Sequence, residues 1–148
     1  MSSVREQVLT AVMTALNTGR PGGIPAAERT RVLALEVANL PSIVLVPRRE
    51  SVQFKGGRWS PLVERTLTIE LEHRAAGGSG VTSEQAADAL LSWPVKALCG
   101  NTLGGLAIEI RESGTEWQYA DGEQPFVLAS QSFEIAYTTR VADADQRV

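Results

Sequence analysis

The sequence predicts a single α+β domain, with a mixed or mainly antiparallel β-sheet and two α-helices packed on one face. Two segments repeat apolar residues at helical spacing, other segments alternate apolar and polar residues as half-buried strands do, and their order is helix, strands, helix, strands. The chain has 148 residues, of which 43% are hydrophobic, which suffices for one packed core. We expect residues 1–141 to form the domain and residues 142–148 to form a polar, frayed tail.

The first element is an amphipathic helix from Ser3 to about Asn17. Ser3 and Glu6 have the spacing of a capping box, and apolar residues then recur at the helical period. This apolar face consists of Val4, Val8, Ala11, Val12, Ala15 and Leu16. Residues 17–23 end the helix, because their glycines favour positive φ and their proline prevents helix continuation.

A first strand is predicted at residues 42–46, where a continuous β-branched run lies between Pro41 and Pro47. Residues 48–61 are polar and are interrupted by two glycines, so we expect an exposed loop or hairpin. Cations dominate this segment, with Glu50 as its single acid. The cations are Arg48, Arg49, Lys55 and Arg58.

Residues 63–72 alternate apolar and polar side chains and predict a long half-buried strand. Ser83 is then expected to cap a second helix, which Pro94 should kink or interrupt. Its apolar face comprises Ala86, Ala87, Leu90, Leu91 and Leu98.

Three further segments read as strands. Residues 106–111 and 115–119 alternate over short stretches and predict two separate strands, and residues 127–141 predict one long strand. Together with the earlier elements they complete the helix, strands, helix, strands order of an α+β domain.

No constellation of residues for catalysis or metal binding is found, so we expect a protein that is not an enzyme and has no catalytic residue, cofactor or metal. His73 is the only histidine and Cys99 the only cysteine, which is too few for a metal cluster. The glycine pair before Leu106 follows a predicted helix, whereas a phosphate-binding loop follows a strand and precedes a helix. Cys99 is expected to be a small, partly buried thiol without a disulfide partner.

Composition sets broad limits on partners. No apolar stretch is long enough to cross a bilayer, so no membrane association is expected. The formal net charge of −3 is the opposite of the basic surplus that nucleic-acid binding usually requires, so we expect no sequence-specific binding to nucleic acid. The single cysteine is consistent with the cytoplasm.

One charge asymmetry stands out along the chain. The segment 48–58 is basic, whereas the segment 112–123 is acidic. In a head-to-tail ring each subunit presents one surface and receives another, so complementary patches would suit a ring contact. Two independently solvated loops are the alternative. The candidate contact residues are Arg48, Arg49, Lys55, Arg58 and Trp59 from the basic segment, and Glu116, Trp117 and Asp121 from the acidic one. Burial of Trp117 within its own subunit is also expected.

The order of these pieces resembles the tail terminator, or tail completion, proteins of long-tailed bacteriophages, the minor tail protein U-like family. The resemblance begins with the capped helix at residues 4–8, the strand entry at residues 40–45 and the long strand at residues 65–71. It continues with Leu103-Gly104-Gly105-Leu106-Ala107, Gly114-Thr115-Glu116-Trp117 and the closing residues 133–140. Nearly the whole chain is covered.

The resemblance implies a structural virion protein without catalytic residues. Its subunits would form a hexameric ring that caps the tail tube, ends tube polymerisation and provides the surface for head joining. The implied partners are the chain itself, the tail tube protein and a head-tail connector protein, with the ring lumen as a passage for DNA. Its place would be the head-proximal end of the tail, after assembly in the host cytoplasm. Two alternatives are a head-tail connector or stopper subunit and a small ligand-binding α+β domain.

Overall fold

A computed structural model describes residues 3–29, 41–54, 61–77, 80–120, 126–141 and 143–147. Two α-helices, one short 3₁₀ helix and six strands form in these ranges, and they confirm the predicted α+β class. In chain order they are α1 (Val4–Asn17), β1 (Ala27–Arg29), β2 (Ser42–Phe54), β3 (Leu62–Ala76), α2 (Ser83–Leu98), η2 (Leu103–Gly105), β4 (Glu109–Ala120), β5 (Phe126–Arg140) and β6 (Asp143–Arg147).

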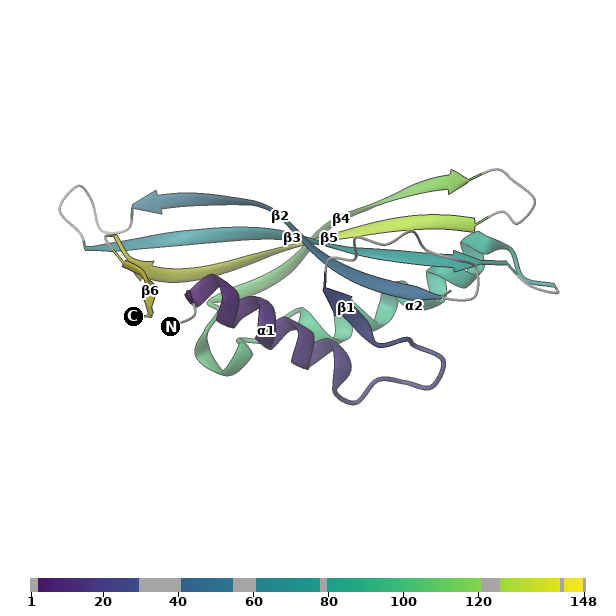
Figure 1. Cartoon of the computed structure of the whole chain (residues 1–148), viewed down its shortest axis with the longest axis horizontal. Coiled ribbons are helices and arrows are strands. Elements are labelled where there is room, and N and C mark those ends of the chain that lie inside the picture. Colours follow the sequence, from purple (N-terminus) through teal and green to yellow (C-terminus); the bar gives the residue numbers. More distant parts are fainter. Residues whose placement is uncertain are drawn as a thin grey trace.

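The strands form one mixed sheet in the order β1-β2-β3-β5-β4, with β6 paired to β5 (Figure 1). Among the described strands, β1 alone pairs in parallel, with β2, and the other pairings are antiparallel. The β3–β5 pair is central and runs without interruption from Leu62↔Arg140 to Ala76↔Phe126. Consequently β2 and β5 run in one direction, and β3 and β4 run in the other.

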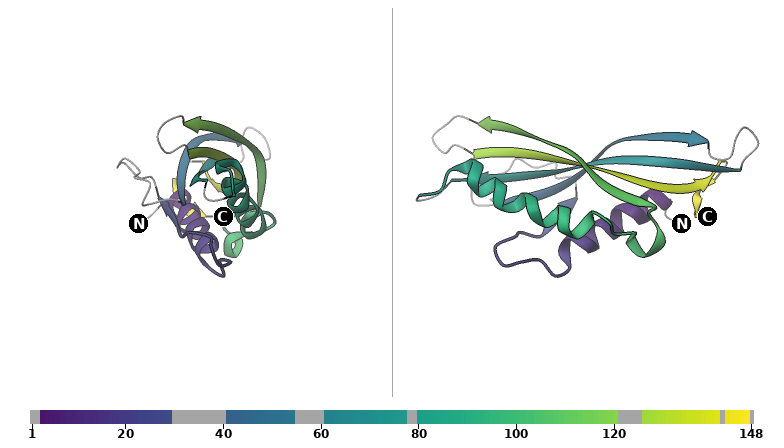
Figure 2. Two further views of the ribbon diagram at one scale, coloured as in Figure 1. Left: turned by 90° about the vertical axis from the view of Figure 1, so that its right-hand side faces the viewer. Right: turned by 180° about the vertical axis from the view of Figure 1, so that it is seen from behind.

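Both helices lie on the same side of the twisted sheet (Figures 1 and 2). Burial along β3 agrees with this arrangement, because Leu67, Ile69 and Leu71 are buried and the residues between them are only partly buried. We call the side bearing the helices the helix face. The opposite side is the open face, and it carries Thr66, Thr68, Glu70 and Glu72 of β3 and Ser130, Ser132 and Glu134 of β5.

The main core joins α1 to the central strands on the helix face. Phe133 and Tyr137 are its largest fully buried side chains. A smaller cluster beneath α2 contains Ala75, Ala87, Leu90, Val127 and Ala129. Burial of such apolar surface is the main stabilising contribution to a domain of this size.

Both helices begin at side-chain caps. Ser3 Oγ accepts from the Glu6 amide at 3.1 Å, as the sequence predicts for α1. For α2 the cap is Thr82 rather than the predicted Ser83, and Gln85 completes a reciprocal capping box. Pro94 lies inside α2 and does not end it, because the helix continues to Leu98.

Of the two alternatives predicted for residues 48–61, an exposed loop or a hairpin, the structure shows a hairpin strand, because β2 continues to Phe54 and pairs antiparallel with β3. Two other expectations about element boundaries are wrong. The two strands predicted at residues 106–119 are one strand, β4, with a register shift between Glu112 and Gly114. The polar tail is not frayed throughout, because residues 143–147 form β6 and pair with β5.

Candidate assembly surface

The basic residues predicted for a partner contact have different surroundings. Arg48 is at the register shift of β2 and forms ion pairs with two acids of β3, Glu70 and, at 3.0 Å, Glu72. Its charge is therefore largely compensated within its own chain. Arg49 is exposed on the open face, opposite Thr68, and forms no ion pair within the described part of the chain. Lys55, Arg58 and Trp59 lie outside the described residues.

The acidic candidates lie on β4. Glu116 is exposed on the open face, where it pairs in register with Ser130, and it too has no ion pair among the described residues. Trp117 points to the helix face beside Glu84 and Asp88 of α2, but 45% of its surface is exposed. The expected burial of Trp117 is therefore wrong, because an edge strand leaves one flank of its side chain uncovered. Asp121 lies outside the described residues.

The structure separates the two charged segments within one chain. Residues 46–54 of β2 continue past its pairing with β1 and have a described strand neighbour only on the β3 side. β4 has one only on the β5 side. Each segment is thus an edge of the described sheet, with main-chain N–H and C=O groups directed away from it. Arg49 and Glu116 lie on opposite edges and cannot meet in one subunit.

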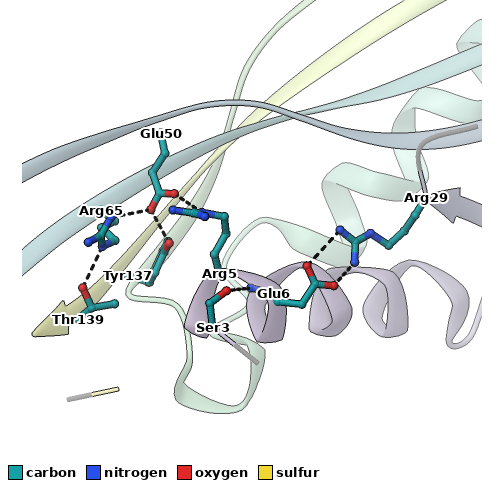
Figure 3. A network of polar contacts seen from close by, with 8 residues as sticks. All are labelled: Ser3, Arg5, Glu6, Arg29, Glu50, Arg65, Tyr137 and Thr139. Atoms are coloured by element: carbon teal, nitrogen blue, oxygen red, sulfur yellow. Dashed lines mark hydrogen bonds and ion pairs between the residues drawn. The ribbon is translucent and has the colours of Figure 1, made fainter. Parts of the chain in front are cut away.

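A polar network near the start of α1 was not predicted (Figure 3). Its centre is Glu50, which accepts hydrogen bonds from the Tyr137 hydroxyl and the Arg5 side chain. Arg65 Nη1 lies 3.6 Å from the same carboxylate, and Arg65 Nε donates to Thr139 at 2.9 Å. Burial and the adjacent carboxylate of Glu50 raise the pKa of Tyr137, so its phenol remains protonated. The network ties α1 to three strands and is best explained as structural.

His73, which directly follows the strand predicted at residues 63–72, lies within β3 and is fully buried on the helix face. Its Nε2 lies 3.0 Å from Gln131 Oε1. The Gln131 amide nitrogen donates to Leu91 O and Glu112 Oε2, so Gln131 presents its oxygen to the ring and His73 Nε2–H donates. Nδ1 is buried and has no hydrogen-bond partner among the residues that the structure describes. Burial lowers the pKa of His73 to about 4, although the bond to Gln131 opposes this shift.

A half-open groove of about 830 Å³ lies between the loop after α1, the end of β3 and α2. Its walls are mostly small and apolar, with Ile24, Leu90 and Trp93 as the larger apolar side chains. The Trp93 ring nitrogen donates to Leu16 O at 2.9 Å, so this polar group is already used. Ser92 and Lys96 are the side chains of the described lining that could offer polar contacts to a ligand.

No group of three or more His, Cys, Asp or Glu side chains that could hold a metal ion occurs in the ranges that the structure describes. Cys99 is partly buried and forms no disulfide. Neither described helix has the length and apolar character needed to traverse a bilayer.

The ion pairs between β2 and β3 could not be predicted from the sequence, because they join residues that are distant along the chain. The alternation of β3 places Glu70 and Glu72 on one face, and this signal was available. Their pairing with Arg48 depends on the register between β2 and β3, which no local pattern specifies. A scan against protein-family models and a search of curated proteins each found no match for this chain.

Proposed function

We propose that this protein is a tail terminator of a long-tailed bacteriophage, a structural subunit whose ring caps the tail tube, ends its polymerisation and offers a surface for head joining. The observation that carries the proposal is the presence of two differently charged sheet edges on opposite sides of one small domain. A head-to-tail ring needs two unlike surfaces of this kind on each subunit.

The resemblance of the sequence to tail terminators supports the same proposal, because it concerns the order of segments that form the fold. The capped first helix, the long strand at residues 65–71 and the closing strand at residues 133–140 correspond to α1, β3 and β5. These three elements supply most of the main core.

The groove beside α2 does not favour the ligand-binding alternative. Small-molecule sites combine an apolar cavity with several convergent polar groups that fix the ligand. Among the described residues of this lining, Trp93 already donates its ring N–H within the protein, and Lys96 is exposed. The surface features of the sheet edges are the stronger basis for a function.

In this proposal the partners are other copies of the chain, the tail tube protein and the head-tail connector protein. The protein acts in the virion at the head-proximal end of the tail, after assembly in the host cytoplasm. Its contribution is geometric, since a ring seated on the last ring of tube protein blocks further addition. DNA passes through the lumen without sequence-specific contact.

The test is electron microscopy of lysates from the parent phage with this gene disrupted, with the intact gene supplied in trans as the control. Overlong tubes with separate filled heads, both corrected by the supplied gene, are expected. Tails of normal length would overturn the proposal. If those normal tails were accompanied by unattached heads, the result would assign the chain to the head-tail connector instead.

A further inference from the structure

The described sheet ends on both sides in strands with free edges. Residues 46–54 of β2 form one edge and β4 (Glu109–Ala120) forms the other. Such edges are templates for pairing with another strand, and proteins usually cover or blunt them. A contact between these two edges of neighbouring subunits would give both of them a strand partner.

We infer that the β2 edge of one copy of this chain pairs antiparallel with the β4 edge of the next copy, so that the sheet continues from subunit to subunit. The inference rests on the proposed function, because it takes the ring as the assembly. Strand direction favours it. β2 and β4 run in opposite directions within the chain, so adding β4 of one copy to β2 of the next preserves the antiparallel alternation of β2, β3, β5 and β4.

Apolar side chains at both edges fit a covered surface. Phe54 is 66% exposed on β2, and Tyr119 is 60% exposed on β4. Val52 and Trp117 are exposed along the same two edges. Aromatic residues at an exposed strand edge favour aggregation unless a partner covers them, and they are enriched in the centres of specific interfaces.

The charges on the two edges indicate that the partner of each edge is the other edge of a second copy. They disfavour pairing of β2 with β2 or of β4 with β4. Arg49 on β2 and Glu116 on β4 both lie on the open face without an ion pair in the described residues. A β4–β4 contact would bring Glu116 towards the acids of the other β4 strand, and a β2–β2 contact would bring two Arg49 side chains together. Directly opposed like charges across strands are unfavourable, whereas Arg49 opposite Glu116 is favourable.

This charge pair also sets the register. With the irregular residue after Pro47 and the one after Glu112 left unpaired, Arg49 opposite Glu116 aligns residues 46–54 of one copy with residues 110–118 of the next. Within one sheet the row that contains Arg49 contains Thr68, Glu134 and Arg111, whereas Glu116 lies opposite Ser130, so this contact is displaced by four rows along β5, or about 14 Å. Closed sheets require such a stagger, because their strands tilt relative to the axis. A contact without stagger would place Arg49 beside Arg111.

Cysteine cross-linking tests the arrangement directly. Cys99→Ser provides a cysteine-free background, and Ser51→Cys marks the open face of β2. Glu109→Cys, Gly114→Cys and Gln118→Cys mark three spaced positions on the same face of β4. Ser51→Cys chains are mixed with each β4 variant, in solution and on capped tubes, and are treated with a short bismaleimide. Cross-linked dimers are expected only in mixtures, most strongly with Gly114→Cys, which faces Ser51 in the inferred register.

Two results would overturn the inference. One is cross-linking of a single variant with itself as strongly as in the mixtures, because this would indicate pairing of like edges. The other is the absence of cross-links in every mixture, both in solution and on tubes. This result counts against the inference whether the chain forms rings or stays monomeric. Capped tubes without cross-links would contradict the inferred strand pairing but not the proposed function. Cross-links without capped tubes would support the strand pairing and contradict the proposed function.

Charge exchange provides an independent readout. Arg49→Glu and Glu116→Lys should each weaken self-association about fivefold, and the double variant should restore it. Lys96→Glu, which changes an exposed cation on α2, is the control and should have little effect. If the double variant associated more weakly than either single variant, Arg49 and Glu116 would not face each other.

Discussion

His73 donates from Nε2 to Gln131 Oε1 across the β3–β5 pair, at 3.0 Å, while its buried Nδ1 has no hydrogen-bond partner in the described part of the chain. The ring is therefore held in its neutral form inside the sheet. Protonation would place a charge at a fully buried site, where the hydrogen-bond partner of the ring is the neutral amide of Gln131. This arrangement makes the stability of the fold dependent on pH.

We predict that the free energy of unfolding decreases between pH 6.5 and pH 4. The pKa of His73 is lowered to about 4 in the folded protein, so the unfolded chain binds a proton first as the pH falls. The contribution is fully present above pH 6.5, and about 3 kcal/mol of it is lost by pH 4. Urea unfolding at several pH values measures it. His73→Gln should remove this component, and an unchanged pH dependence in that variant would contradict the assignment.

The network around Glu50 predicts a coupled effect on stability. Tyr137→Phe should cost about 1 kcal/mol, because it removes one donor but leaves Arg5 and Arg65 on the carboxylate. Glu50→Ala should cost about 3 kcal/mol, because it leaves several half-buried donors unpaired. Urea unfolding of the double variant should show a cost smaller than the sum.

The control for this network is the ion pair between Arg111 and Glu134 on the open face, where both side chains are more exposed. Glu134→Ala should change stability by no more than about 0.5 kcal/mol. A large effect of Glu134→Ala together with strictly additive effects at Glu50 and Tyr137 would show that burial of the network has been misjudged.

The capping box of α2 predicts a local effect on helix stability. Thr82→Ala removes the acceptor for the Gln85 amide, which lies 3.2 Å from Thr82 Oγ1, and should cost about 1 kcal/mol. Ser83→Ala is the matched control, since Ser83 is the residue that the sequence suggested as the cap. Thermal unfolding followed by circular dichroism compares the two variants. Equal losses in both would contradict the position of the cap.

Replacement of glycine by alanine should have different effects on stability at two positions. A Cβ on Gly77 would lie 2.8 Å from Val81 O and 2.9 Å from Ser83 N, both of which are main-chain atoms. Gly77→Ala should therefore cost about 1–3 kcal/mol, because the main chain entering α2 must shift. Gly114→Ala meets nothing within 4 Å and should be close to neutral. Chemical denaturation of both variants decides, and a neutral Gly77→Ala would refute the close approach.

Local pattern was sufficient to predict the elements whose side chains alternate between core and surface. Leu67, Ile69 and Leu71 identify β3 in the sequence, and the spacing of Val4, Val8 and Val12 identifies α1. These residues all point into one core, so their spacing in the sequence is that of a strand in β3 and of a helix in α1. The α+β class follows from their order.

The rest depends on pairing between distant segments. Only Val52 and Phe54 are apolar in residues 49–54, so the local alternation is too short to predict the strand, which depends on hydrogen bonding to β3. Ser113 and Gly114 resemble a turn in sequence, but the register shift accommodates them within β4. The partners of Arg48 and Glu50 are likewise set by strand register. The residue types in the sequence suggested which side chains take part in contacts. That the basic and the acidic segment lie on opposite edges of the sheet follows only from the fold.

The chain ends give one practical consequence of the contact between α1 and β6. Because the last strand packs against the first helix, the two ends of the described fold emerge at the same end of the elongated domain (Figure 1). Epitope tags at either end would therefore mark a common pole of the subunit. Gold-labelled antibody against such a tag would then report the polarity of the subunit within an assembled particle.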